Sequence, residues 1–151
     1  MTGVQTCALP ISAEGAEDVE VDADFKGQTF NRIDQSIAMG ALFTASHLGA
    51  KAIVALTESG STALWMSRRR VHIPIYAVTT KLSSQRKMAL FRNVRPLLMD
   101  TSADRDTALM QTEGYLKKRN IVSTGDVYAI TCGEPMGSPG GTNMLKICRV
   151  G

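Results

Sequence analysis

The sequence predicts an α/β domain of three layers, α/β/α, around a five-stranded and mostly parallel sheet. The first observation behind this prediction is that short apolar, β-branched runs alternate with segments of helical spacing, as in successive right-handed βαβ units. The second is that the last connection, 133–142, has no helical pattern, whereas a parallel crossover needs about a dozen residues or more. The fifth strand is therefore expected to run antiparallel beside the fourth, which gives the strand order 3-2-1-4-5.

Apolar residues recur at helical spacing over 31–48, and Gly49 follows as a stop signal. The inward face of this helix is expected to hold Ile37, Ala41, Leu42, Ala45 and Leu48. A second long helix is expected over 103–119, with basic residues at its end and an inward face of Ala108, Leu109, Tyr115 and Leu116. Shorter helices are expected over 63–70 and 83–92, and strands over 51–56, 75–79, 94–99, 126–132 and 144–150.

The first 30 residues do not have the sequence pattern of this domain. Residues 1–11 resemble the conceptual translation of a sequencing-library adapter, so 1–12 are interpreted as an artefact or a disordered terminus. Residues 13–30 are acidic, then polar, and are typical of a linker. The domain proper is expected over 31–151, as the tail of a longer protein.

Charge is distributed unevenly along the 151 residues, whose formal net charge is +3. Residues 1–24 contain six acids and no Lys or Arg, so the remainder, with all 17 bases and eight acids, has a charge of +9. Such a region could attract phosphorylated small molecules or nucleic acid. No apolar run reaches the roughly 18 residues of a membrane span. Three cysteines without metal or redox spacing favour a reducing compartment.

The turn 57–62 is the best candidate for a binding site. It joins an apolar strand to a helix and combines four hydroxyls, a glycine and the free N–H groups of a helix start, which suits a phosphate. The alternative is that Ser59 or Ser61 simply caps the helix. In the order 3-2-1-4-5 the chain reverses between strands one and four, and ligands bind at the carboxyl ends of those strands. Because the turn and the loop 133–142 both lie at those ends, the phosphate interpretation is favoured.

No catalytic constellation accompanies this turn. His47 and His72 have no partner spacing for a metal or a catalytic triad, and Cys132 and Cys148 fall on adjacent expected strands as core thiols. The turn lacks the lysine and glycine spacing of a nucleotide-binding P-loop. The glycines of the loop 133–142 would allow a ligand to approach closely, or would make the loop merely flexible. The pattern therefore indicates binding without catalytic or metal-binding residues.

Taken together, four motifs resemble the C-terminal domain of pyruvate kinases of bacterial type. They are Asn31–Met39, Ala55–Ala63, Ser123–Val127, and Gly140–Asn143 followed by Lys146–Val150. The resemblance covers roughly residues 28–151 and implies the same sheet. It also implies a cytoplasmic glycolytic parent enzyme that transfers the phosphoryl group of phosphoenolpyruvate to ADP, forming ATP, with magnesium and potassium as its ions. That chemistry would lie in a preceding (β/α)8 barrel, so the fragment itself is expected to need no cofactor.

In this family the C-terminal domain carries an allosteric site and an interface of the homotetramer, and it contacts its own catalytic barrel. The resemblance places the effector phosphate on Thr57, Ser59, Gly60, Ser61 and Thr62. It places a closing loop at Gly137, Ser138, Pro139 and Gly140. Members that bind fructose 1,6-bisphosphate often have a basic residue where this chain has Glu58, and an arginine near Ala108. A sugar monophosphate or AMP is therefore the expected effector.

Two other functions are compatible with parts of the sequence. A free-standing module that binds a phosphorylated metabolite would use the same turn without a catalytic barrel. A nucleic-acid binder would use the +9 region, but aromatic residues make up only 5% of the chain and it contains no recognised motif. We therefore expect neither nucleic acid nor a membrane among the partners.

Overall fold

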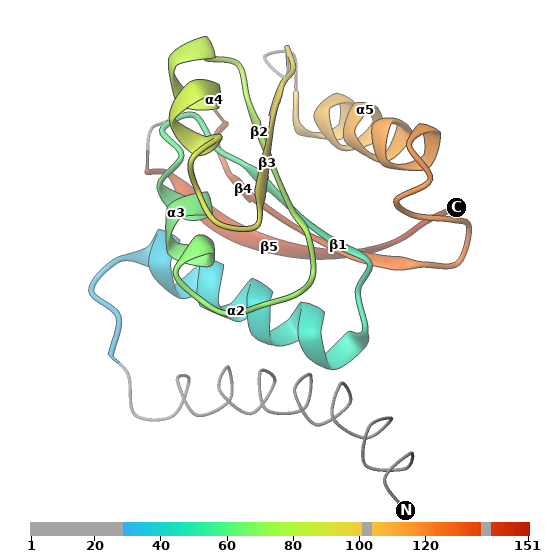
Figure 1. The fold of residues 1–151 in the computed structure, drawn as a ribbon, viewed down its shortest axis with the longest axis horizontal. Coiled ribbons are helices and arrows are strands. Elements are labelled where there is room, and N and C mark those ends of the chain that lie inside the picture. The colour runs from blue at the N-terminus through green and yellow to red at the C-terminus, as the bar shows by residue number, and fades with distance from the viewer. Residues whose placement is uncertain (1–28, 101–103, 137–139) are drawn as a thin grey trace, which may run out of the picture.

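The computed structural model describes residues 29–100, 104–136 and 140–151 as one α/β domain (Figure 1). Its helices are α2 (Ile33–Leu48), α3 (Ser61–Ser67), α4 (Leu82–Met88) and α5 (Arg105–Lys118). Its strands are β1 (Ala52–Leu56), β2 (Ile75–Thr79), β3 (Val94–Leu98), β4 (Val127–Gly133) and β5 (Thr142–Arg149). The sheet has the order β3-β2-β1-β4-β5, and all neighbours are parallel except β4 and β5. The predicted order and the antiparallel fifth strand are thus confirmed.

The central strands are apolar because helices cover both of their faces. All five residues of β1 and all five of β2 are buried, as expected for the middle of a parallel sheet. Strand β3, at the edge, is only partly buried and contains Pro96 opposite Ala77 of β2. An edge position tolerates proline, because a proline has no N–H to donate to a further strand.

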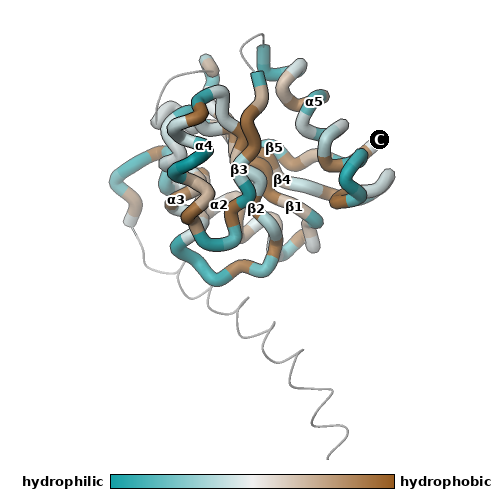
Figure 2. The backbone as a smooth tube through the Cα atoms, turned by 45° about the horizontal axis from the view of Figure 1, so that its top comes forward, coloured by the Kyte–Doolittle hydropathy of each residue, from teal (hydrophilic) through white to brown (hydrophobic). Residues whose placement is uncertain are grey.

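Two apolar clusters form the core, one on each side of the sheet. Helices α2, α3 and α4 pack on one face, where Ala41, Met66 and Met88 meet Ile53 and Ile75. Of the described helices, α5 is the one that covers the other face, where its Leu109 and Leu116 belong to one cluster with Val54, Tyr128 and Ile130. Figure 1 shows α5 apart from the other three helices, and Figure 2 shows the hydrophobic strands enclosed between the layers. The three-layer prediction is therefore confirmed.

The inward face of α2 differs from the predicted one. Leu48, expected in the core, is 54% exposed, and Ile37 is only half-buried. The predicted Ala41, Leu42 and Ala45 are buried, and the buried row also contains Asp34, Ala38 and Met39. The apolar pattern missed these three because small alanines let the helix lie close to the sheet, and because a carboxylate occupies one of the positions. Gly49, with φ of 64°, ends the helix as predicted.

Helix α5 differs in one inward residue. Tyr115 is half-buried rather than buried, with the Arg119 guanidinium 5.0 Å from its ring centroid. Thr112 is buried in its place, and its hydroxyl donates to the Ala108 carbonyl oxygen at 2.7 Å. That bond satisfies the hydroxyl within the helix, so threonine can occupy an apolar face.

Leu116 should be a large contributor to the stability of the α5 layer. It is fully buried, so Leu116→Ala should lower the free energy of unfolding by about 2–5 kcal/mol through the lost burial and the remaining cavity. Leu90 provides the matched control, because it is 88% exposed and the same substitution there should change stability by less than about 0.5 kcal/mol. Urea denaturation of the two variants checks this, and equal losses would contradict the assignment of Leu116 to the core.

The start of α5 should make stability depend on pH. Asp104 caps the helix by accepting the Thr107 N–H at 2.6 Å, and this bond lowers the pKa of its carboxyl below the ordinary value. A lowered pKa in the folded state stabilises the fold above the ordinary carboxyl pKa, and this contribution is lost as the pH falls through the lower value. Asp104→Ala should therefore lower the melting temperature at neutral pH, with the difference from wild type shrinking in strong acid. A difference that stays constant across this range would refute the charged cap.

Candidate functional site

The turn 57–62 lies at the carboxyl end of β1, where the prediction placed it. The Thr57 N–H still donates to Val78 of β2 at 2.9 Å, and the chain then leaves the sheet for α3. Gly60 is the N-cap residue of α3 and has φ of 84°, in the left-handed region. A Cβ there would lie 3.0 Å from Cγ of Met88, so both the backbone and the packing favour glycine. In the alternative prediction a serine caps this helix, but the N-cap residue in the structure is Gly60.

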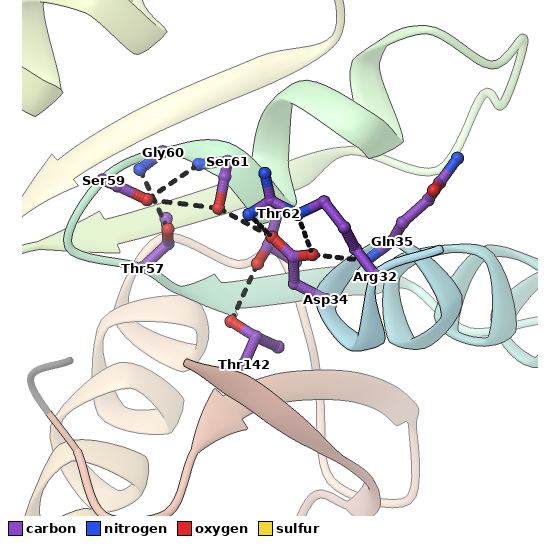
Figure 3. A network of polar contacts seen from close by, with 9 residues as sticks. All are labelled: Arg32, Asp34, Gln35, Thr57, Ser59, Gly60, Ser61, Thr62 and Thr142. Carbon is purple, nitrogen blue, oxygen red and sulfur yellow. Dashed lines mark hydrogen bonds and ion pairs between the residues drawn. The ribbon is translucent and has the colours of Figure 1, made fainter. Parts of the chain in front are cut away.

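The four hydroxyls of the turn all have protein partners (Figure 3). Thr57 Oγ1 accepts the Gly60 N–H at 3.0 Å, which closes the turn. Ser59 Oγ accepts the Ser61 N–H at 3.3 Å and donates to Ser61 Oγ at 3.1 Å. Thr62 is fully buried, and its hydroxyl donates to Thr142 Oγ1 of β5 at 2.8 Å. Ser59 and Ser61, both half-buried, therefore present the hydroxyls that solvent can reach.

A buried carboxylate stands directly beside these serines. The Asp34 side chain is 1% exposed, and its Oδ2 accepts the Ser61 hydroxyl at 3.0 Å. Arg32 donates to both carboxylate oxygens, at 2.9 Å from Nε and 2.8 Å from Nη2, and the Gln35 N–H donates at 2.9 Å. Figure 3 shows these side chains converging on Asp34 between α2 and the turn. The prediction missed this pair, although an acid on the inward face of a helix is a signal that could have revealed it.

Helix α4 holds the opposite side of the turn. The Lys87 ammonium donates to the Ser59 carbonyl oxygen at 2.6 Å, and the Ser84 hydroxyl donates to the Glu58 carbonyl oxygen. The Glu58 carboxylate accepts the Thr80 hydroxyl at 2.6 Å. Two carbonyl oxygens of the turn are thus engaged by donors of α4. Sequence reasoning also missed Lys87 as a cation of this site.

The second loop is anchored at both of its ends. The Asn143 side chain accepts the Glu134 N–H and donates to the Glu134 carbonyl oxygen, both at 3.0 Å, while Arg105 Nη1 lies 3.3 Å from the Glu134 carboxylate. A Cβ on Gly133 would lie 2.7 Å from the Gly141 carbonyl oxygen, so this close approach requires glycine. Of the loop residues proposed to close over an effector, Gly137, Ser138 and Pro139 lie outside the described residues. Gly140 is described and exposed.

The other candidates remain outside this site. His47 Nδ1 lies 2.8 Å from the Phe43 carbonyl oxygen, and its ring stacks on that of Phe43. Cys132 is buried, and burial raises the pKa of its thiol, as expected for a core cysteine; Cys148 is half-buried. Within 29–100, 104–136 and 140–151, no three His, Cys, Asp or Glu side chains gather to hold a metal ion.

The helices of the described segments are also too short or too polar to cross a membrane. At the end of α3, the Arg68 guanidinium lies 4.8 Å from the Trp65 ring centroid, so this tryptophan packs beneath a basic side chain. The geometry therefore leaves the turn 57–62, with its neighbours Arg32, Asp34 and Lys87, as the candidate site.

Comparison with known proteins gives the family. Residues 35–148 match the family model described as pyruvate kinase, alpha/beta domain. The chain is 33% identical over 141 residues to "Pyruvate kinase" of Buchnera aphidicola subsp. Baizongia pistaciae and to "Pyruvate kinase II" of Salmonella typhimurium, and each alignment covers 93% of this chain and 29% of the relative. It is 36% identical over 144 residues to "Pyruvate kinase" of Staphylococcus epidermidis, covering 95% of this chain and 25% of the relative.

The chain thus spans between a quarter and a third of the length of these curated relatives. The family match, the sheet order and the four sequence motifs all coincide on the same part of the chain. This chain belongs to the pyruvate kinase family and has the fold of its C-terminal alpha/beta domain.

Proposed function

We propose that this chain is the regulatory and oligomerisation domain of a pyruvate kinase, and that it is not itself catalytic. The parent enzyme would transfer the phosphoryl group of phosphoenolpyruvate to ADP in the cytoplasm, as a glycolytic homotetramer. The names of the relatives support the activity. The chain covers 29% of the length of two of them, which supports a non-catalytic role for this domain beside a separate catalytic barrel. Magnesium and potassium would bind in the catalytic barrel of the parent, which this domain would contact.

The turn 57–62 is proposed as the binding site for the phosphate of an allosteric effector. The main support is that side chains of α4 donate hydrogen bonds to the carbonyl oxygens of Glu58 and Ser59. Carbonyl oxygens repel an anion, so a phosphate site needs them held away from its N–H and hydroxyl donors. The Ser59 and Ser61 hydroxyls donate to Ser61 Oγ and to Asp34 in this structure, so they would have to rotate toward a bound phosphate, while Thr62, whose hydroxyl is committed to Thr142, would contribute through its N–H.

The charges around the turn support a ligand with one phosphate. Lys87 and Arg32 lie on either side of the turn; one of their two positive charges balances Asp34, and the other offsets part of the charge of a single phosphate. The Glu58 carboxylate, held by Thr80, would repel a second phosphate nearby. We therefore propose a sugar monophosphate or AMP as the effector. The loop between Gly133 and Thr142 would complete the site.

Regulation would act by a shift of population. An effector that binds the active tetramer more tightly than the inactive one stabilises the active form by its difference in binding free energy. The turn is a suitable place for this, since α2, α4 and β5 all contribute bonds to it or to its neighbours. Binding there can therefore alter three elements at once.

Calorimetric titration tests this site directly. Glucose 6-phosphate, ribose 5-phosphate, AMP and fructose 1,6-bisphosphate are titrated into the 151-residue chain, and one monophosphate should bind selectively. Ser59→Glu should weaken that binding at least about tenfold, because its carboxylate would occupy and repel the anion position.

Ser123→Glu is the control, because it adds the same charge at an exposed residue near the start of β4, at the opposite end of the sheet. Unchanged affinity in Ser59→Glu would refute the assignment of the turn. A preference for the bisphosphate would refute the proposed class of effector.

A further inference from the structure

An ion pair with two hydrogen bonds, next to the turn, joins two residues that are two apart in the chain. Asp34 is an ionised side chain in a buried position, and burying such a charge is costly unless it is paired and hydrogen-bonded. Arg32 supplies the pairing charge, with Nε on one carboxylate oxygen and Nη2 on the other. Arg32 lies just before α2 and has an extended backbone, with φ of −128° and ψ of 140°. Its side chain can therefore lie alongside that of Asp34, two residues later.

This pairing leaves part of the guanidinium available. A guanidinium has five N–H donors on a rigid plane, and a carboxylate that binds Nε and Nη2 occupies only one edge. The second edge consists of Nη1 and the remaining N–H of Nη2. Within the described part of the chain Nη1 makes no hydrogen bond, and the Arg32 side chain is 54% exposed. Arg32 can therefore bind a second oxyanion without releasing the first.

The Arg32 guanidinium lies near both loops of the site. Through Asp34 and the Ser61 hydroxyl, Arg32 is connected to the turn 57–62. Its Nη2 lies 3.3 Å from where a Cβ on Gly140 would be, next to β5. Figure 3 shows the guanidinium beside Asp34 and close to the serines of the turn. The arginine thus stands between the turn and the end of the second loop.

We propose that Arg32 is a ligand of the effector phosphate and that Asp34 is the residue that positions it. This inference rests on the proposed function, because it takes the turn 57–62 as the phosphate site. Asp34 fixes the guanidinium plane and accepts the Ser61 hydroxyl, so one buried carboxylate holds the arginine next to the turn. The ligand class is a phosphate monoester in its dianionic form, which a bidentate arginine edge matches in geometry and charge.

Affinity measurements on three variants of the 151-residue chain test this. The probe is whichever of glucose 6-phosphate, ribose 5-phosphate and AMP binds the wild type most tightly. Arg32→Gln should weaken binding about ten- to a hundredfold, the value of a hydrogen bond to a charged group. Asp34→Asn should weaken it similarly, because an amide N–H₂ repels one of the donors. The double variant should lose little more than Arg32→Gln alone, since Asp34 acts through Arg32.

Arg32→Lys covers the case in which Arg32→Gln fails to fold. Lysine can still pair with Asp34 but has no second edge, so the fold should remain and binding should still weaken. Arg149→Gln is the matched control: it removes the same charge at the opposite end of the sheet, where its Nη1 donates to Gly125, and should leave affinity unchanged. Melting temperatures of all variants separate weakened binding from unfolding.

The ³¹P signal of the bound monoester provides a readout that a purely structural role would not move. An arginine on the phosphate favours the dianion, so the second pKa of the bound ligand should lie below its free value of about 6. In Arg32→Lys that pKa should move back toward the free value.

The failures are distinguishable. Wild-type binding that Arg32→Lys leaves unchanged in affinity and in ³¹P titration would overturn the role of Arg32 and leave the turn as the site. A further large loss from Asp34→Asn on top of Arg32→Gln would overturn the positioning role of Asp34. Binding of no probe by the wild type would overturn both this inference and the proposed function.

Discussion

The buried carboxylate of Asp34 is the constraint on which the candidate site depends. Its charge must be compensated in a place that water does not reach, and the donors come from three separate positions: Arg32 before α2, the first turn of α2 itself, and Ser61 of α3. Because the donors must all remain in place, this one charge holds the start of α2 against the turn at the end of β1.

The rest of the site follows from the topology of the sheet. Strands β1 and β4 are parallel neighbours, so the turn after β1 and the loop after β4 leave the same edge. The antiparallel β5 returns from that loop and brings Thr142 to the buried hydroxyl of Thr62. Helix α4, which follows β2, then engages the carbonyl oxygens of the turn. Three connections that are distant in sequence therefore meet around a few residues.

The difference between local signals and contacts between distant residues explains how much the sequence could predict. Alternating apolar runs and the length of each connection are local signals, and they were enough for the three layers, the strand order and the position of the turn. The contacts of Asp34 with Ser61 and of Lys87 with Ser59 join residues 27 and 28 positions apart. No local pattern encodes such pairs. An apolar pattern likewise cannot include the Asp34 carboxylate among the buried residues of α2.

At the proposed phosphate site, attraction and selection of an anion would have different sources. Residues 59–99 contain eight Lys and Arg residues and no Asp or Glu, so this segment, which runs from α3 to β3, produces a positive field. Such a field accelerates the approach of any anion, but salt screens it within about 8–10 Å and it does not discriminate between ligands. Discrimination requires donors held at fixed positions, which the turn 57–62 and its neighbours Arg32 and Lys87 would provide. The buried Asp34 lowers the local positive charge, yet it fixes the orientation of Arg32 and Ser61 in return. A site arranged in this way would select ligands by the positions of its donors more than by their net charge. That property suits the recognition of one phosphate among the many anions of a cell.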